Sequence, residues 1–310
     1  MKNNIIYIVI ATSLKRTDML INKALYSVYR QQNINPKNIK VLIVDDNKDA
    51  REIINIKIQI KILREKLCFT NKNIFHTTIL KNQRTPYRSG TGSWNTAIEI
   101  INQNENKNSY IAILDDDDHY SDNYLNILFD TLKKKPKTIA IFSPLTKCFK
   151  EYEEIFTFTK KDLTAENFFI GNPGIQGSNM FFKSTILKNI NAFDEALNSA
   201  TDRDLMIRFI DYVTKKSLFE NIEILTNSYV FYNANNNNSI THNLEKKHLG
   251  LDTFYKKHTH MFSNIALNAS LERAKKLFNY HGKETLSNNK DYLKVKIYLT
   301  PTDTIQSRTL

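Results

Sequence analysis

Short apolar runs alternate with amphipathic stretches along most of the chain. The runs at 5–11, 39–44 and 110–114 are rich in isoleucine, valine and leucine, a pattern typical of strands buried on both faces. Apolar residues recur at helical spacing in 19–31, and 49–69 also predicts a helix. This alternation favours an α/β fold with a mixed, mostly parallel sheet flanked by helices. Further strands are expected at 74–80, 138–143, 178–182 and 221–232, a hairpin at 147–159, and helices at 122–134, from Trp94 onward and from Thr201 onward.

The C-terminal part of the chain has a different pattern. Two amphipathic helices are predicted at 244–258 and 265–280, after a polar loop rich in asparagine. The stretch 290–310 shows no legible periodicity. We therefore expect one α/β domain over residues 1–240 and a C-terminal helical extension with a tail over 241–310.

Composition indicates a globular protein, because 41% of the 310 residues are hydrophobic and 25% are charged. No apolar run approaches the ~20 residues of a membrane span. The first residues resemble a secretion signal only superficially, since the alternation around Tyr7 suits a first strand better. We therefore expect a cytoplasmic protein. Cys68 and Cys148 have no metal-binding or redox spacing and are expected to be reduced.

The net charge of +12 and a pI near 9.4 favour anionic partners. Candidates are a nucleoside diphosphate, an anionic polymer, nucleic acid or a phospholipid surface; the alternative is a lysine-rich composition spread over solvated faces. No recognition helix, zinc spacing or RNA-binding aromatic pattern supports nucleic acid, and we expect none as a partner. The basic C-terminal helices are candidates for peripheral membrane contact or for a homodimer interface.

Four consecutive carboxylates, Asp115 to Asp118, directly follow the apolar run at 110–114. Adjacent carboxylates raise each other's pKa unless a cation or hydrogen-bond donors offset their repulsion. Mg²⁺ or Mn²⁺ suits such a cluster, because a hard divalent ion takes oxygen ligands and keeps positions for a substrate's phosphates. Ligands of open α/β sheets bind at the carboxyl ends of strands, so we expect a functional site here. The alternative is a solvated acidic loop.

A second pair of carboxylates, Asp45 and Asp46, ends the apolar run at 39–44. These side chains could accept hydrogen bonds from a ribose or a base, or they could cap the following helix. Gly90 and Gly92 lie in a loop that turns tightly or approaches a ligand closely. Such a loop before a helix N-terminus could hold a phosphate. Its glycine spacing is neither that of a P-loop nor that of a dinucleotide fingerprint, however, and a plain turn is nearly as good an interpretation.

Four other residues carry candidate chemistry. Asp202 and Asp204 fall in the first turn of the helix predicted from Thr201, where the helix dipole alone accounts for acidic residues. His242 could reach a metal or a phosphate, although a lone histidine in a loop is more often solvated. Trp94, the single tryptophan, is as consistent with a core anchor as with a pocket wall.

Several of these stretches together resemble glycosyltransferase family 2, the inverting GT-A transferases. YIVIATSLKRTDML is similar to the family's opening strand, VLIVDDN to its nucleotide-contacting strand end, and RSGTGSWNTAI to its arginine- and asparagine-containing loop. LDDDD resembles its metal motif, and NINAFDEAL with TDRDLMIRF resembles its acceptor-side segment. The order and spacing of these pieces over 5–210 make the set specific. The resemblance implies a GT-A, Rossmann-like fold and does not cover the region after His242.

The resemblance also implies roles for individual residues. Asp202 matches the family's catalytic base, although the family often has Glu-Asp where this chain has Thr201-Asp202. Asp115 and Asp117 would ligate Mn²⁺ or Mg²⁺, with His242 as a further candidate ligand. The donor nucleotide would contact Thr12, Asp45, Asp46, Arg84, Arg88, Asn95, Asp115 and Asp116, and the acceptor would lie beside Trp94 and Glu195.

These roles imply a metal-dependent, inverting glycosyltransferase of the hexosyltransferase type. It would move a sugar from a nucleoside-diphosphate sugar, most readily a UDP-sugar, to a hydroxyl of an acceptor glycan, lipid, protein or peptide. A carboxylate would take the hydroxyl proton, and a cation would stabilise the leaving diphosphate. Two alternatives are a nucleotidyltransferase on an α/β sheet and a catalytically silent, transferase-like module that binds an anionic polymer.

Overall fold

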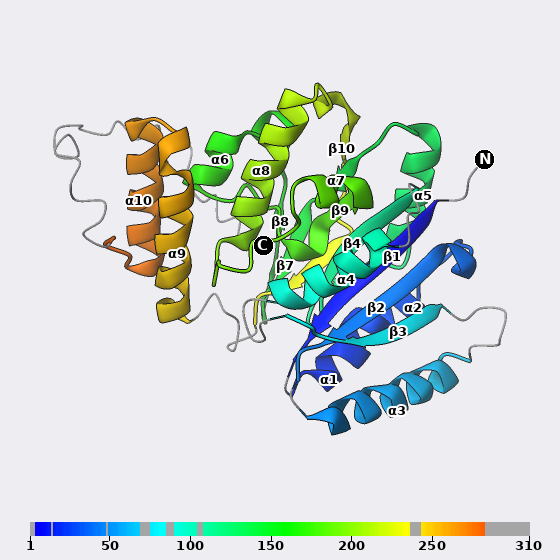
Figure 1. Cartoon of the computed structure of the whole chain (residues 1–310). Coiled ribbons are helices and arrows are strands. Elements are labelled where there is room, and N and C mark those ends of the chain that lie inside the picture. The colour runs from blue at the N-terminus through cyan, green and yellow to red at the C-terminus, as the bar shows by residue number, and fades with distance from the viewer. Residues whose placement is uncertain are drawn as a thin grey trace.

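The protein is built around one large sheet of seven strands (Figure 1). A computed structural model describes residues 4–13, 15–47, 49–68, 75–84, 90–103, 108–235 and 243–282. In spatial order the strands of this sheet are β10 (Ile222–Ile224), β6 (Ala140–Phe142), β9 (Met180–Lys183), β4 (Ser109–Asp115), β1 (Ile5–Thr12), β2 (Ile39–Asp45) and β3 (His76–Lys81).

The large sheet is mostly parallel, which confirms the fold class expected from the sequence. Strands β4, β1, β2 and β3 run parallel to one another, and so do β6 and β10. Only β9 runs the other way, between β4 and β6. A second sheet has the order β5 (His119–Tyr120), β11 (Val230–Asn233), β7 (Leu145–Cys148) and β8 (Glu153–Phe156).

Two strand predictions have different outcomes in the smaller sheet. The hairpin expected at 147–159 is confirmed, since β7 and β8 pair in antiparallel fashion. The single strand expected at 221–232 is wrong, because the chain leaves the large sheet after β10 and joins the small sheet at β11. The turn-forming residues Asn227 and Ser228 lie between these strands.

The helices agree with the sequence periodicity where they are long. Helix α4 nevertheless begins before the predicted Trp94, after Gly90, which adopts a left-handed backbone (φ 75°). The short α6 and α7 were not predicted, because six residues do not establish a period. The helices are α1 (Thr17–Met19), the π-helical η1 (Leu20–Leu25), α2 (Tyr26–Tyr29), α3 (Ala50–Lys66), α4 (Thr91–Gln103), α5 (Tyr124–Lys134), α6 (Ala165–Ile170), α7 (Ser184–Asn189), α8 (Thr201–Lys215), α9 (Leu244–His258) and α10 (Asn264–Phe278), with 3₁₀ turns η2 (Pro36–Asn38), η3 (Lys160–Asp162), η4 (Gly177–Asn179), η5 (Phe219–Asn221) and η7 (Thr259–Met261).

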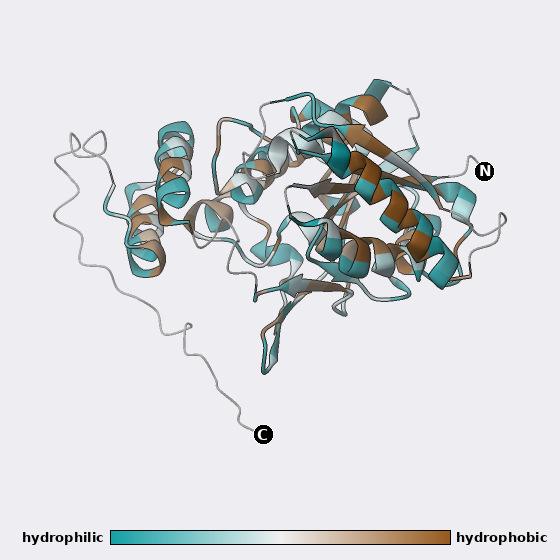
Figure 2. Ribbon diagram, turned by 90° about the horizontal axis from the view of Figure 1, so that it is seen from below, coloured by the Kyte–Doolittle hydropathy of each residue, from teal (hydrophilic) through white to brown (hydrophobic). Residues whose placement is uncertain are grey.

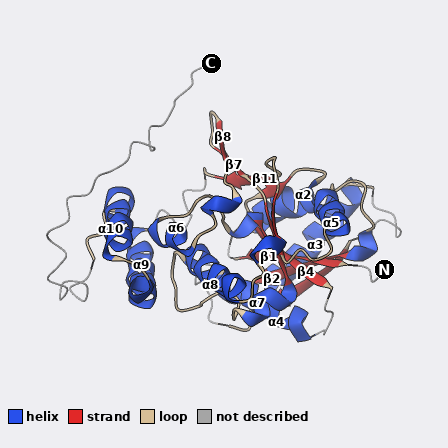
Figure 3. Cartoon of the chain, turned by 90° about the horizontal axis from the view of Figure 1, so that it is seen from above, coloured by secondary structure: helices blue, strands red, loops and turns tan. Residues whose placement is uncertain are grey.

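Helices cover both faces of the large sheet (Figure 3). Strand β1 shows why: Ile6, Ile8 and Ile10 are buried in one core, and Tyr7 and Val9 are buried in the other. The first core is closed by α2, α3 and α5, and the second by α4, α7 and α8. None of the described helices is both long and apolar enough to cross a membrane.

Helices α9 and α10 lie side by side and pack on α6 and α8 (Figure 1). The Ser199 hydroxyl donates to the Lys247 carbonyl at 3.1 Å, and the backbone of Gly250 closely approaches Ser199. Buried Arg203 donates to the Phe168 carbonyl at 2.7 Å, and its guanidinium lies 4.3 Å from the Phe254 ring centroid. The C-terminal helices thus share a core with the α/β part, and the domain boundary near residue 240 stays a prediction.

Gly250→Ala should destabilise the protein, because a Cβ at this position would lie 2.2 Å from Ser199 Oγ and 2.4 Å from its backbone nitrogen. In an uncrowded helix the same change would stabilise by about 1 kcal/mol. We expect the free energy of unfolding in urea to fall by about 1–3 kcal/mol. Lys246→Ala, at an exposed position of the same helix, is the control and should have little effect. A stabilising Gly250→Ala would contradict the close packing of α9.

Candidate active site

Three predicted site residues meet at the carboxyl edge of the large sheet. The register pairs Thr12 of β1 with Asp45 of β2, and Ala11 of β1 with Asp115 of β4. Parallel strands end at the same edge, so side chains far apart in the sequence become neighbours there. This edge is the position at which open α/β sheets bind ligands.

The carboxylates that end β2 are held by the protein itself. Asp45 is fully buried and accepts from Asn47 Nδ2 at 2.5 Å and from Lys81 Nζ at 3.3 Å. The Asp46 carboxylate accepts from the Asn82 side chain. Neither residue caps the following helix, because the N-cap of α3 is Asp49. The capping alternative is therefore excluded, and donor contact by Asp45 and Asp46 stays a prediction.

Arg16 offsets the charge of two carboxylates in the acidic cluster. Its Nε lies 2.8 Å and 2.9 Å from the two oxygens of Asp116, and its Nη2 lies 3.0 Å from Asp117. Asp116 is only 2% exposed, which leaves it little surface for the donor contact expected of it. The sequence analysis missed Arg16; its only signal was a basic residue in the turn after the first strand.

Asp118 ties the end of β4 to the surrounding elements. Ser178 Oγ donates to its Oδ2 at 2.5 Å, and the backbone N–H of Asn233 donates to its Oδ1 at 2.9 Å. Burial and the charge of Asp117 raise the pKa of Asp118 to about 7 in spite of these bonds. Asp118 therefore anchors the cluster to η4 and β11.

Asp115 and Asp117 are the carboxylates of the cluster best suited to a cation. Burial raises the pKa of Asp115 well above its ordinary value, and the charges of its three acidic neighbours and of Asp202 raise it further. Within the described ranges, no group of three or more histidine, cysteine, aspartate or glutamate side chains is arranged to hold a metal. Two carboxylates nevertheless fit Mg²⁺ or Mn²⁺, which are commonly held by one or two carboxylates and completed by substrate phosphates.

Asp202 is the second residue of α8, which begins directly after Ala200, whose backbone is left-handed (φ 61°). Its Oδ1 is buried and has no hydrogen-bond partner within the described part of the chain. Burial raises the pKa of Asp202 to about 7, and the positive charge of Lys247 on α9 partly opposes that rise. Repulsion from the Asp202 charge also contributes, after burial and the charges of Asp116 to Asp118, to the raised pKa of Asp115.

Asp204, in the same helical turn, is occupied by cationic neighbours. Its carboxylate is fully buried and lies 2.7 Å from Lys257 Nζ, 2.7 Å from Arg208 Nη2 and 2.8 Å from His258 Nε2. Burial alone would raise the pKa of Asp204, but the hydrogen bond from His258 and the charge of Arg208 hold it well below its ordinary value. A carboxylate paired in this way is a poor base, so Asp204 joins α8 to α9.

The structure brings Arg84, Asn95 and Glu195 together. Arg84 Nη1 donates to Glu195 Oε1 at 2.8 Å, and Asn95 Nδ2 donates to the same oxygen at 2.7 Å. Asn95 also exchanges two hydrogen bonds with the backbone of Phe193. Two residues expected at the donor thus lie beside one expected at the acceptor. They border a cleft of about 990 Å³ formed by α4, α7 and the loop that carries Glu195.

Trp94, expected beside the acceptor, is instead a core residue. It is 5% exposed, and its ring centroid lies 4.8 Å from that of Phe193. Of the remaining predicted site residues, Arg88 and His242 lie outside the described residues, so their roles stay predictions.

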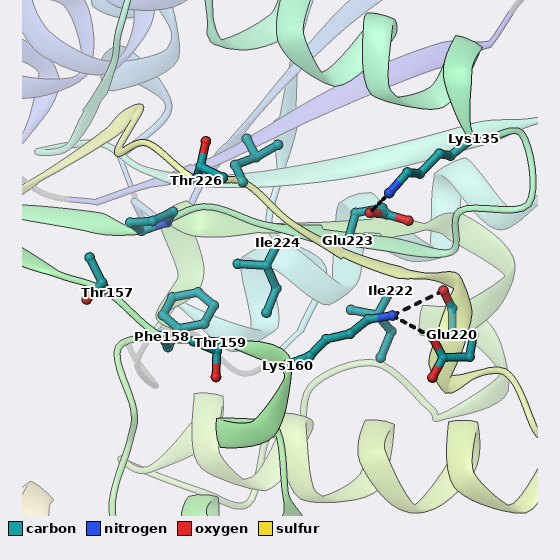
Figure 4. Close-up of a pocket in the computed structure, with 12 residues that line it drawn as sticks. Lys135, Thr157, Phe158, Thr159, Lys160, Glu220, Ile222, Glu223, Ile224 and Thr226 are labelled. Carbon is teal, nitrogen blue, oxygen red and sulfur yellow. Dashed lines mark hydrogen bonds and ion pairs between the residues drawn. The ribbon is translucent and has the colours of Figure 1, made fainter.

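A second cleft, of about 590 Å³, lies along β10 (Figure 4), and no residue of the acidic cluster lines it. Phe158 and Ile224 line its interior, and the ion pairs Lys135–Glu223 and Lys160–Glu220 lie at its rim. It contains no residue of the carboxyl edge, so we do not assign the predicted chemistry to it.

Comparison with known proteins shows which family the chain belongs to. The model for glycosyl transferase family 2 matches residues 8–190, and the chain belongs to this family. It is also 28% identical over 243 residues to an uncharacterized glycosyltransferase of Mycoplasma pneumoniae, a match that covers 75% of this chain and 71% of that protein. The protein is therefore a glycosyltransferase, which favours glycosyl transfer over the nucleotidyl-transfer alternative.

Solved structures agree on the fold. S. aureus TarS 1-349 in complex with UDP-GlcNAc superposes with a TM-score of 0.56 at 15% identity, covering 94% of this chain and 76% of that one. The mannosyltransferase PcManGT from Pyrobaculum calidifontis, in complex with GDP-Man and Mn²⁺, gives 0.51 at 14% identity, with coverages of 89% and 76%. The predicted GT-A fold is confirmed.

Asp204→Asn should destabilise the protein by about 3 kcal/mol at neutral pH, because it removes the charge that compensates Lys257 and Arg208 and weakens the contact with His258. A carboxylate with a lowered pKa stabilises the fold above its ordinary pKa, and this contribution is lost as the pH falls. The difference from wild type should therefore shrink in urea unfolding below about pH 4. The control is Asp211→Asn, which removes an exposed pair with Lys215 on the same helix and should cost less than about 0.5 kcal/mol. Equal effects of the two variants would contradict the anchoring role.

Proposed function

We propose that the protein is a cytoplasmic, metal-dependent, inverting glycosyltransferase of the hexosyltransferase type that uses a nucleoside-diphosphate sugar, most readily a UDP-sugar. The observations that carry this proposal are the position of Asp115 and Asp117 at the end of β4, on the carboxyl edge of the sheet, and the buried Oδ1 of Asp202 on α8, which has no hydrogen-bond partner among the described residues. Structures with the same fold are complexes with UDP-GlcNAc and with GDP-Man and Mn²⁺, which supports this donor class.

The donor nucleotide lies against the sheet edge in this proposal. Asp45 and Asp46 bind its ribose or base, and their own hydrogen bonds keep them in place. Asp115 and Asp117 hold Mn²⁺ or Mg²⁺ beside the diphosphate. When bound, the ion neutralises charge that develops on the leaving diphosphate. Arg16 keeps Asp117 oriented and limits repulsion within the cluster.

Asp202 acts as the base. An acceptor hydroxyl is a weak nucleophile, so a positioned carboxylate removes its proton as the oxygen attacks the anomeric carbon. The bond between that carbon and the diphosphate breaks, and the nucleoside diphosphate leaves with the electron pair. Attack from the face opposite the diphosphate inverts the configuration. A half-buried carboxylate with an unpartnered oxygen is suited to this proton transfer. The acceptor is a hydroxyl of a glycan, lipid, protein or peptide that approaches past Glu195.

Two variants separate the proposed roles. Asp117→Asn should abolish metal-dependent donor binding, because it removes a metal ligand. Asp202→Asn should leave donor binding intact and lower transfer by about 10²–10⁴-fold, the usual contribution of a general base. Donor binding is measured by calorimetry with UDP-sugars and GDP-sugars, and transfer by release of the nucleoside diphosphate.

The matched control for these variants is Asp122→Asn, which changes an exposed carboxylate paired with Arg30. It should bind donor and turn over like wild type. If Asp202→Asn keeps most of its activity, the base assignment is withdrawn. If wild type is no more active than Asp117→Asn, the silent binding module becomes the better account.

The rate should depend on the protonation of Asp202. Only its carboxylate form accepts a proton, and its pKa of about 7 means that kcat/KM should fall below neutral pH, to about a tenth of its alkaline plateau at pH 6. Lys247→Gln removes the charge that opposes the raised pKa, so it should move this acidic limb to higher pH. Lys246→Gln, an exposed neighbour, is the control. A pH profile that is flat between 5 and 8, or unmoved by Lys247→Gln, would count against the assignment.

A further inference from the structure

Helix α3 carries an apolar stripe on the face that points away from the core. Ile54, Ile58 and Ile62 are 58%, 52% and 50% exposed, whereas Ile56 and Ile60 of the same helix are buried. Residues four apart lie on one face of a helix, so these three side chains form a continuous row, which we call the isoleucine stripe. Figure 2, seen from below, shows hydrophobic residues alternating with hydrophilic ones along α3 at the surface. A contiguous exposed apolar row indicates an interaction surface, whereas single exposed apolar residues are normal on a protein surface.

Basic side chains surround the isoleucine stripe. Lys57, Lys61 and Lys66 are exposed on the same helix, which contains five basic and two acidic residues over its seventeen positions. Glu65 lies 4.0 Å from Lys61, but both side chains are largely exposed, and such a pair offsets little charge. The surface of α3 beside the isoleucine stripe therefore carries a net positive charge, and the whole chain has a net charge of +12.

The exposed isoleucines and the basic side chains around them together indicate which kind of partner binds this helix. A second copy of the chain would bring two positively charged helices face to face, and like charges across an interface oppose association. An anionic phospholipid surface uses both features, because the isoleucines enter the boundary between headgroups and acyl chains while the lysines contact lipid phosphates. We propose that α3 docks the protein on an anionic phospholipid surface through the isoleucine stripe.

Because α3 begins near the candidate active site, docking through this helix also positions that site. The helix starts at its N-cap Asp49, only a few residues after Asp45 and Asp46 at the carboxyl edge of the sheet. Docking through α3 brings that edge close to the lipid surface. The exposed apolar residues of α9 and α10 do not repeat at four-residue intervals, so they form no comparable stripe. The membrane contact expected of the C-terminal helices stays a prediction, and the isoleucine stripe of α3 is the surface that we propose here.

The test is co-sedimentation of the full chain with vesicles. Wild type should bind vesicles of phosphatidylcholine and phosphatidylglycerol in a two-to-one mixture, and should bind pure phosphatidylcholine weakly. Ile54→Gln/Ile58→Gln/Ile62→Gln should lower the partition coefficient at least about tenfold, because it removes the apolar contact and keeps good helix formers. Lys57→Gln/Lys61→Gln should lower it about fivefold per lysine, and added salt should do the same.

The matched control is Ile265→Gln, which removes an isoleucine that is 73% exposed on α10 and should leave vesicle binding unchanged. Circular dichroism and urea unfolding verify that each variant is folded. The proposal is overturned if wild type does not bind anionic vesicles, or if the triple isoleucine variant binds as well as wild type. It is also overturned if wild type is a dimer in sedimentation analysis and the triple variant is a monomer, since the stripe would then join two copies.

Discussion

Repulsion among the four carboxylates that follow β4 is the constraint on which the site depends. Asp116 is neutralised by Arg16, which comes from the turn after β1, and Asp118 is bonded to Ser178 and to the backbone of β11. These partners come from three separate parts of the chain, so compensation of the charge also fixes the strand ends relative to one another. Arg16 also contacts Asp117, but a single guanidinium offsets only one negative charge, so a divalent ion would relieve the repulsion that remains in the cluster.

The C-terminal helices have a direct part in this arrangement. They pack on α8, the helix that carries Asp202, and α9 supplies Lys247 near Asp202 and both Lys257 and His258 at Asp204. Buried Arg203 adds hydrogen bonds to α6 and a contact with Phe254. Asp202, the proposed base, therefore lies in the N-terminal turn of a helix that other elements contact on two sides. Such support restrains a catalytic side chain to one geometry, which matters because small displacements cost much of the rate.

Much of the fold was predictable because its strands are buried on both faces and its long helices keep a clear period. Strand ends with acidic residues also located the carboxyl edge correctly. Contacts between distant segments were not predictable: nothing in the sequence pairs Arg16 with Asp116 or His258 with Asp204. Trp94 was ambiguous for the same reason, since its burial depends on Phe193, far along the chain. The isoleucines of α3 were unpredictable in another way. The sequence pattern indicates a helix, but it does not indicate which apolar face of that helix is left exposed.

The central claim is that the carboxyl edge binds a nucleoside diphosphate together with a divalent ion. Thermal unfolding of the wild-type protein with UDP or GDP, each with and without Mn²⁺, tests it most directly. A ligand that binds only the folded state at a hundred times its dissociation constant adds about 2.7 kcal/mol of stability. The account predicts a rise in Tm with at least one diphosphate that requires Mn²⁺. No rise with either diphosphate, together with a rise with a nucleoside triphosphate or an anionic polymer, would contradict it.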